Sequence, residues 1–208
     1  PRPDHLVVNL VSEDSVFCAG KAPLRKYEAI CTVGKSEFSI PFYSVIPKSH
    51  KPVPAFVHIN FRPDIPDKFM PSEEVSDRGF AVFSFCYNDV TLDSPEEKEF
   101  RDKAARYLLP KRRSKNSPGK ISLWAWFAMR IMDYIETLEN IDKDNVAVIG
   151  SSTLGMAALV AGGFDERFKY VISNCSGCLG AALTRGKSGE SVQKIASTAP
   201  HLFCINNI

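Results

Sequence analysis

The order of hydrophobic and polar residues predicts alternating strands and helices over most of the chain. Two runs, 53–60 and 79–87, are almost continuously apolar, as expected of strands buried on both faces of a sheet. Segment 121–140 repeats apolar residues at three- and four-residue spacing, which predicts an amphipathic helix. The alternation continues as strand, helix and strand over residues 146–149, 154–161 and 170–173. This order predicts a mostly parallel sheet with helices on both faces, in three layers.

The N-terminal part of the chain has a different pattern. Residues 27–33 and 37–47 read as two strands around a Gly-Lys-Ser turn, which predicts an antiparallel hairpin. Pro41 inside the second run indicates either an edge position or a bulge. Residues 1–26 show little periodicity and mixed charge, so we expect the tail of a longer N-terminal region there, with His5 in a frayed end.

The polar middle of the chain, residues 88–119, is expected to contain a helix at 94–109 and then a basic loop at 111–120. A basic loop can bind phosphate or nucleic acid. No aromatic residues are interleaved with these lysines and arginines, so a solvated loop is the favoured interpretation. Short helices are expected at residues 72–77 and 190–197.

Length and composition are those of one soluble globular domain, spanning residues 1–208. Hydrophobic residues make up 44% and charged residues 24% of the 208 residues, and the net charge of +2 does not indicate a nucleic-acid partner. No run approaches the roughly 18 apolar residues of a membrane helix, and the first residues, P-R-P-D-H-L, do not form a signal peptide. We therefore expect a soluble protein without a membrane partner.

The six cysteines are too few for a disulfide scaffold in a chain of this length. Cys86 ends an apolar run and is expected to be a buried thiol. The pair Cys175 and Cys178 lacks a second pair, so no metal site is expected. A thiol redox role for this pair, or a disulfide between Cys178 and Cys204, remains a minor alternative.

The strongest chemical signal is G-S-S-T-L-G at residues 150–155, between a buried strand and a small-residue helix. A strand that ends in G-x-S and turns at once into a helix is the layout of a nucleophile elbow, in which a sharp turn projects the hydroxyl above the sheet. Ser152 is then the nucleophile, and the Thr153 backbone N–H contributes to an oxyanion hole. The alternative is an ordinary strand-to-helix turn in which Ser152 caps the helix.

The segment from Val146 to Leu183, with the helix at 121–138 and the stretches 185–195 and 200–204, resembles the glucuronoyl esterase family of carbohydrate esterases, in particular its bacterial, acetylxylan-esterase-like branch. The resemblance covers roughly residues 40–205. It implies an α/β-hydrolase fold and supports Ser152 as the nucleophile position. It also implies a carbohydrate ester substrate from the plant cell wall.

Two residues at the elbow depart from the family pattern G-[CH]-S-R-x-G-K. Thr153 stands at the position of the arginine, which in the family helps to stabilise the oxyanion, and Met156 stands at the position of the lysine that contacts the uronate sugar. Threonine offers a backbone N–H but no charge, and a thioether is a poor partner for a sugar hydroxyl. These two residues argue against glucuronoyl specificity.

No catalytic histidine or acid is recognised in the chain. Cys175 stands where fungal relatives place a catalytic glutamate, and bacterial relatives place the acid and the histidine after later strands. His50 precedes strand 53–60, at the wrong end of the sheet; His58 lies inside that strand as a core residue; and His201 matches a family position that is not the base. We therefore expect a truncated domain without its C-terminal strands, and a missing C-terminal segment or partner chain that covers the apolar edge at 170–173.

These observations favour a serine carboxylic-ester hydrolase that works by acyl transfer. Ser152 attacks the ester carbonyl, while the N–H groups of Thr153 and of Phe61, in the loop after strand 53–60, hold the oxyanion. The expected partner is a small-molecule or polysaccharide ester, with no metal or organic cofactor. The rival reading is a catalytically inactive relative that kept the fold for binding or as a scaffold, favoured by Thr153, Met156 and Cys175.

Overall fold

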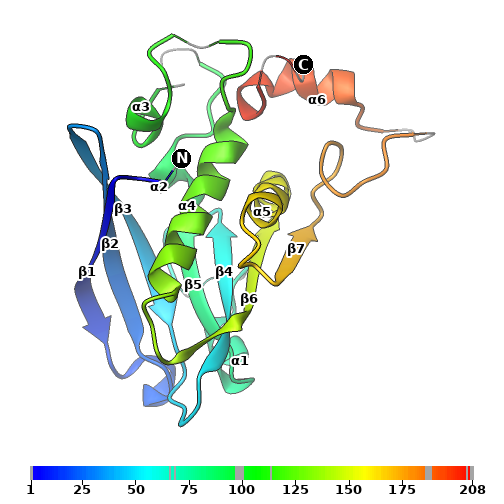
Figure 1. The fold of residues 1–208 in the computed structure, drawn as a ribbon. Coiled ribbons are helices and arrows are strands. Elements are labelled where there is room, and N and C mark those ends of the chain that lie inside the picture. The colour runs from blue at the N-terminus through cyan, green and yellow to red at the C-terminus, as the bar shows by residue number, and fades with distance from the viewer. Residues whose placement is uncertain are drawn as a thin grey trace.

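Seven strands form one mixed sheet, in the order β1-β2-β3-β5-β4-β6-β7 (Figure 1). The structure is a computed structural model that describes residues 2–65, 67, 69–96, 101–112, 114–185, 189–204 and 206. The first three strands and the β3–β5 pair are antiparallel, whereas β5, β4, β6 and β7 run parallel to one another. The predicted α/β class is confirmed, although the sheet is more evenly mixed than a mostly parallel one.

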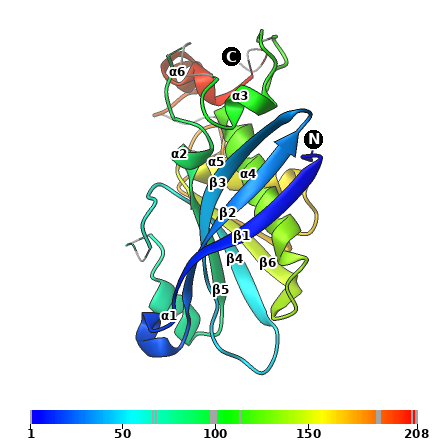
Figure 2. The same ribbon diagram turned by 90° about the vertical axis from the view of Figure 1, so that its left-hand side faces the viewer.

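The antiparallel half contains a strand that the sequence pattern missed. Strand β1 (His5–Asp14) pairs with β2 (Leu24–Val33), which pairs with β3 (Ser36–Val45), and these long strands face the viewer in Figure 2. The expected fraying at His5 is therefore wrong, because His5 is the first residue of β1. Strand β1 is largely exposed at the edge of the sheet, so burial imposes no alternation on its residues.

Pro41 occupies a position that tolerates a missing N–H. It pairs with Glu28 of β2, and this ladder runs without a register shift. On its other side β3 pairs with β5 only at residues 43–45. The edge interpretation of Pro41 is confirmed and the bulge is not observed, because an unpaired side of a strand needs no donor there.

The parallel half follows the hydrophobic pattern closely. Strands β4 (Val53–Asn60) and β5 (Ala81–Cys86) correspond to the two long apolar runs, and β6 (Ile141–Ser151) lies beside β4. Strand β7 (Tyr170–Asn174) ends the sheet. All four strands point their carboxyl ends toward the same edge, which is where ligands bind in open parallel sheets.

Helices α4 (Lys120–Ile135) and α5 (Thr153–Phe164) lie together against the sheet (Figure 1). The predicted helix 121–140 is observed as α4, which ends at Ile135, several residues earlier than predicted. Its aromatic stripe is core packing: Trp124 and Phe127 are fully buried, and the Phe127 ring meets Phe85 of β5 edge-on at 4.9 Å.

The predicted helix at 94–109 is wrong. The described residues there form only α3 (Ala105–Leu108), α2 (Tyr87–Val90) precedes the segment, and residues 97–100 lie outside the described part. Polar side chains in this region make tertiary contacts instead. The fully buried Lys120 ammonium donates to Thr91 Oγ1 at 2.6 Å and to Asp102 Oδ1 at 2.9 Å. A buried charge must be paired in this way.

The remaining short elements lie at the two ends of the sheet. The expected helix 72–77 is confirmed as α1 (Ser72–Asp77), and the expected 190–197 helix is α6 (Val192–Thr198). Single 3-10 turns occur at η1 (Phe17–Gly20) and η3 (Pro200–Leu202).

Strand β7 leaves apolar surface uncovered. Tyr170, Val171 and Ile172 are 52%, 39% and 38% exposed, and among the described residues β7 pairs only with β6. A groove of about 710 Å³ beside it is lined by residues of β4, β6 and β7, among them Phe56 and Ile172, and by Phe80, which precedes β5. The sheet therefore ends on an open, apolar edge strand.

The contrast between two phenylalanines tests the packing of α4. Replacing Phe127, which is fully buried, with alanine should lower the free energy of unfolding by about 3–5 kcal/mol, because the ring leaves a cavity. Phe164→Ala should change it by less than about 1 kcal/mol, because this ring is 82% exposed. Urea unfolding of both variants measures the difference, and equal losses would contradict the described core.

Candidate functional site

Ser152 occupies the sharp turn between β6 and α5, at the carboxyl end of the parallel strands. Its backbone has φ 55° and ψ −129°, which is a strained conformation for a residue with a side chain. The residue is exposed, whereas Leu154 to Ala158 are buried. The turn therefore holds the serine above the sheet.

The Ser152 hydroxyl is not used to cap the helix. Its side chain makes no capping hydrogen bond, and the Ser152 carbonyl accepts the first hydrogen bonds of the helix, from the N–H of Gly155 at 2.9 Å and of Met156 at 3.3 Å. The N-cap interpretation is therefore not supported. At a helix start the earliest N–H groups, here those of Thr153 and Leu154, have no acceptor within the helix, so they are oriented toward negative charge.

Two glycines allow the strand and the helix to approach each other. A Cβ atom on Gly150 would lie 2.1 Å from the Leu154 carbonyl oxygen, a distance that no real contact reaches. A Cβ on Gly155 would lie 3.0 Å from the Cβ of Ser176 and 3.1 Å from the Asn174 carbonyl oxygen. We call residues 150–155 the elbow.

Strand β7 holds the elbow from its other side. The Ser152 N–H donates to the Asn174 carbonyl at 2.9 Å, and the Asn174 amide donates to Ser151 Oγ at 3.4 Å. Ser173 Oγ donates to the Gly155 carbonyl at 2.9 Å. Cys175 follows with φ 50° and an exposed side chain.

Phe61 lies at the matching end of the neighbouring strand. In the β4–β6 ladder the last pair is Ile59 with Gly150, and Phe61 and Ser152 each follow the end of their strand. Adjacent strands are about 4.8 Å apart. The Phe61 ring packs edge-on against Tyr87 at 5.5 Å and tilted against Phe69 at 6.1 Å.

No hydrogen bond found among the described residues joins a histidine to Ser152. His5 is on β1, at the opposite edge of the sheet, and His50 precedes β4, at the opposite end of the strands. His201 is buried, and its Nε2 lies 2.6 Å from Asp93 Oδ1. His58 is buried in β4 with Nδ1 3.2 Å from Ser84 Oγ, and burial lowers the pKa of its imidazole to about 4. Its expected role as a core histidine is confirmed.

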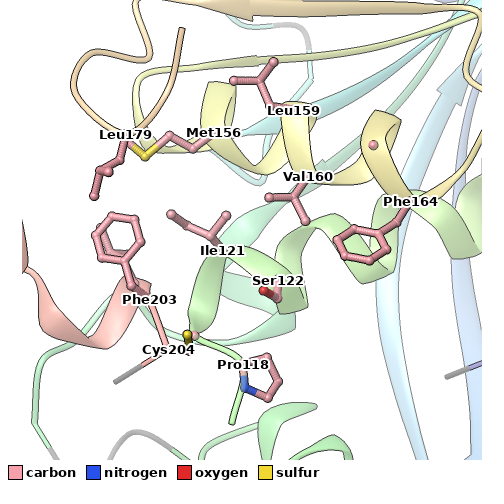
Figure 3. Close-up of a pocket in the computed structure, with 13 residues that line it drawn as sticks. Pro118, Ile121, Ser122, Met156, Leu159, Val160, Phe164, Leu179, Phe203 and Cys204 are labelled. Atoms are coloured by element: carbon pink, nitrogen blue, oxygen red, sulfur yellow. The ribbon is translucent and has the colours of Figure 1, made fainter. Parts of the chain in front are cut away.

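Beyond the elbow, α5 borders an apolar pocket of about 460 Å³. Met156, one helical turn after Ser152, is almost fully buried and lines this pocket with Leu179, Ile121 and Phe203 (Figure 3). No charged side chain is among its lining residues. The surface that continues from the elbow along α5 is therefore hydrophobic.

Within the described ranges, no group of three or more His, Cys, Asp or Glu side chains could hold a metal ion. All six cysteines are free thiols, so the alternative disulfide between Cys178 and Cys204 is not present, and Cys86 is buried as expected. Over the same part of the chain, no helix has the length and apolar character to cross a membrane.

Sequence reasoning missed two asparagines that shape the site. Asn60 and Asn174 each end a strand beside the elbow, and their side chains or carbonyls hold the adjoining backbone. The only signal was their position directly after an apolar run, which is also where ordinary turn residues occur.

The sequence of this chain is similar to those of known esterases. Residues 31–204 match the model of the glucuronyl esterase family of fungi. Over 86 residues, 41% of this chain, the sequence is 51% identical to the carbohydrate esterase MZ0003 from an unknown prokaryotic organism, 20% of whose length is covered. A 4-O-methyl-glucuronoyl methylesterase of Sodiomyces alcalophilus is 37% identical over 87 residues, which cover 38% of this chain and 18% of that protein.

Solved structures extend the likeness to the whole chain. A glucuronoyl esterase from Teredinibacter turnerae superposes with a TM-score of 0.83 at 26% identity, covering 97% of this chain and 53% of its own. One from Solibacter usitatus has the same fold, with a TM-score of 0.84 at 23% identity over 100% of this chain and 61% of its own. The chain thus spans about a fifth of the curated relatives and just over half of the solved ones.

Two glycines test the elbow geometry. Gly150→Ala should destabilise the protein by more than about 2 kcal/mol, because the added methyl group meets a backbone oxygen. Gly163 lies in α5, and a Cβ added there would meet nothing within 4 Å. Gly163→Ala should therefore stabilise the protein by about 0.5–1 kcal/mol. Chemical denaturation measures both, and a tolerated Gly150→Ala would contradict the close approach.

His58 should make stability depend on pH. Its pKa is about 4 in the folded protein and about 6.5 when unfolded. Between these values the unfolded state binds more protons, so the free energy of unfolding should fall as pH drops from 6.5 to 4, by up to about 3 kcal/mol from this residue. His58→Gln should flatten that part of the stability–pH curve; an unchanged slope would contradict the burial argument.

Proposed function

The chain belongs to the glucuronyl esterase family, and from this membership we propose that it carries the nucleophile of a serine carboxylic-ester hydrolase that acts on plant cell-wall carbohydrate esters. The observation that carries the proposal is Ser152, held exposed at a positive φ with its hydroxyl uncommitted to helix capping. Ser152 Oγ attacks the ester carbonyl, its proton passes to a base, and the alcohol leaves. Water then releases the acid and regenerates the serine.

The proposed oxyanion hole uses backbone donors alone. The Thr153 N–H stands at the positive end of α5, and the Phe61 N–H lies at the end of the adjacent strand. Two N–H donors are sufficient for an oxyanion hole in acyl transfer. Thr153 adds no charge, so the developing negative charge is stabilised by dipoles rather than by a cation.

The proposed base and acid come from polypeptide outside residues 1–208. This is supported by the positions of the four histidines, which face other partners or other ends of the sheet, and by the greater length of the relatives. The exposed edge of β7 and its neighbouring groove are the surfaces that we expect this polypeptide to cover.

The proposed substrate is a carbohydrate ester, in keeping with the names of the relatives. The finer choice among such esters depends on the surface next to Ser152, where Met156 is apolar and buried. A sugar hydroxyl would find no hydrogen-bond partner of useful strength in this thioether. We therefore propose a preference for esters that make fewer polar contacts at this position than a glucuronoyl group does.

Ser152→Ala in the full-length protein should abolish hydrolysis of p-nitrophenyl acetate, because no other group replaces the nucleophile. A fluorophosphonate probe should label the wild type at Ser152 and leave the variant unlabelled, which mass spectrometry of the modified peptide checks. Ser39→Ala, at an exposed position of β3 outside the elbow, is the matched control and should keep most of the activity. Absence of labelling in the wild type would favour the inactive, binding or scaffold alternative.

A further inference from the structure

Asn60 is a polar side chain buried at the end of β4, beside the elbow. It is 1% exposed, and both halves of its amide are engaged. Its Oδ1 accepts the backbone N–H of Arg62 at 3.3 Å, and its Nδ2 donates to Asp67 Oδ2 at 2.5 Å. A buried amide with both partners in place fixes the groups that it contacts.

Asp67 anchors this contact to the rest of the loop. Its second oxygen, Oδ1, accepts the backbone N–H of Phe69 at 2.6 Å, and its carbonyl accepts the N–H of Met70 at 3.1 Å. The Phe69 ring packs against Phe61. Asn60 is thus held at one end by β4 and at the other by a carboxylate that is itself tied to the returning chain.

The peptide unit after Phe61 is held on both sides. Its carbonyl oxygen accepts a hydrogen bond from Cys86 Sγ at 3.6 Å, and burial raises the pKa of this thiol, which keeps it a protonated donor. The N–H of the same unit, on Arg62, is held by Asn60. The hydrogen bond from the Arg62 N–H to Asn60 Oδ1 also closes a ring that runs through the preceding Asn60–Phe61 peptide unit, which carries the Phe61 N–H. Because trans peptides are planar, these two contacts restrict the rotation of that N–H.

We propose that Asn60 is a positioning residue for the oxyanion hole. Its amide, pinned by Asp67, holds the backbone so that the Phe61 N–H donates toward the carbonyl attacked by Ser152. The inference rests on the proposed function and extends it, because it assigns the geometry of the second donor to one side chain that does not touch the substrate. Without the amide, the peptide plane at Phe61 can rotate and the donor loses its direction.

Asn60→Ala in the full-length protein should lower kcat for p-nitrophenyl acetate by about 10–100-fold, within the range for a disabled oxyanion donor. KM should change less than about twofold, because the donor acts mainly in the transition state. Phenylboronic acid forms a tetrahedral adduct with an active-site serine, so its Ki should rise by a factor similar to the loss in kcat. A merely structural role would reduce the active fraction without changing Ki.

Asn88→Ala is the matched control. The Asn88 amide also accepts a backbone N–H after a strand, that of Asp93 at 3.1 Å, but it follows β5 rather than β4. This variant should leave kcat and Ki within about twofold of the wild type. Thermal unfolding of both alanine variants separates loss of fold from loss of donor geometry.

An exchange of the two partners covers the case in which Asn60→Ala does not fold. Asn60→Asp alone brings two carboxylates together and should lower kcat, whereas the double variant N60D/D67N restores one donor opposite one acceptor and should recover kcat to within about fivefold. Wild-type Ki and kcat in Asn60→Ala, or no recovery in a folded N60D/D67N, would overturn the role of Asn60. Activity that survives Ser152→Ala would instead overturn the proposed function.

Discussion

The structure depends on the close approach of β6 and α5 at the elbow. No side chain fits at Gly150, where a Cβ would lie 2.1 Å from a backbone oxygen, or fits easily at Gly155. This contact forces the chain to turn within one residue, and Ser152 absorbs the turn with a positive φ. The strain is local, but β4 and β7 hold it on both sides through ladder contacts and the Asn174 carbonyl. A hydroxyl that would otherwise cap a helix is thereby left exposed.

Around this turn, the electrostatics are those of oriented backbone dipoles. The helix start contributes the first N–H groups of α5, and the proposed oxyanion hole adds the Phe61 N–H after β4. The charged side chains named above hold loops by hydrogen bonds. Lys120 donates to Thr91 and Asp102, and Asp67 accepts from Asn60. Preorganised dipoles need no reorganisation when charge develops. The stabilisation that they give to a transition state therefore depends on how rigidly the neighbouring hydrogen bonds hold them.

The hydrophobic surfaces are unevenly covered. Helices α4 and α5 bury a continuous aromatic and aliphatic core against the sheet, whereas β7 and its groove remain exposed. Met156 and its neighbours form an apolar wall that begins one turn from Ser152. An open edge strand is prone to pair with other strands. The exposed edge of β7 is therefore a surface at which further polypeptide can add to the sheet.

The sequence by itself determined the parallel strands, the long helix and the serine at the bend, because burial on two faces and close backbone approach leave direct signatures in residue type. It did not determine β1, whose edge position needs no alternation, or the segment 94–109, whose polar residues serve tertiary contacts rather than a helix surface. Tertiary structure alone decided that Asn60 reaches Asp67 and that His201 lies against Asp93, because such contacts join residues whose separation in the chain carries no periodic signal.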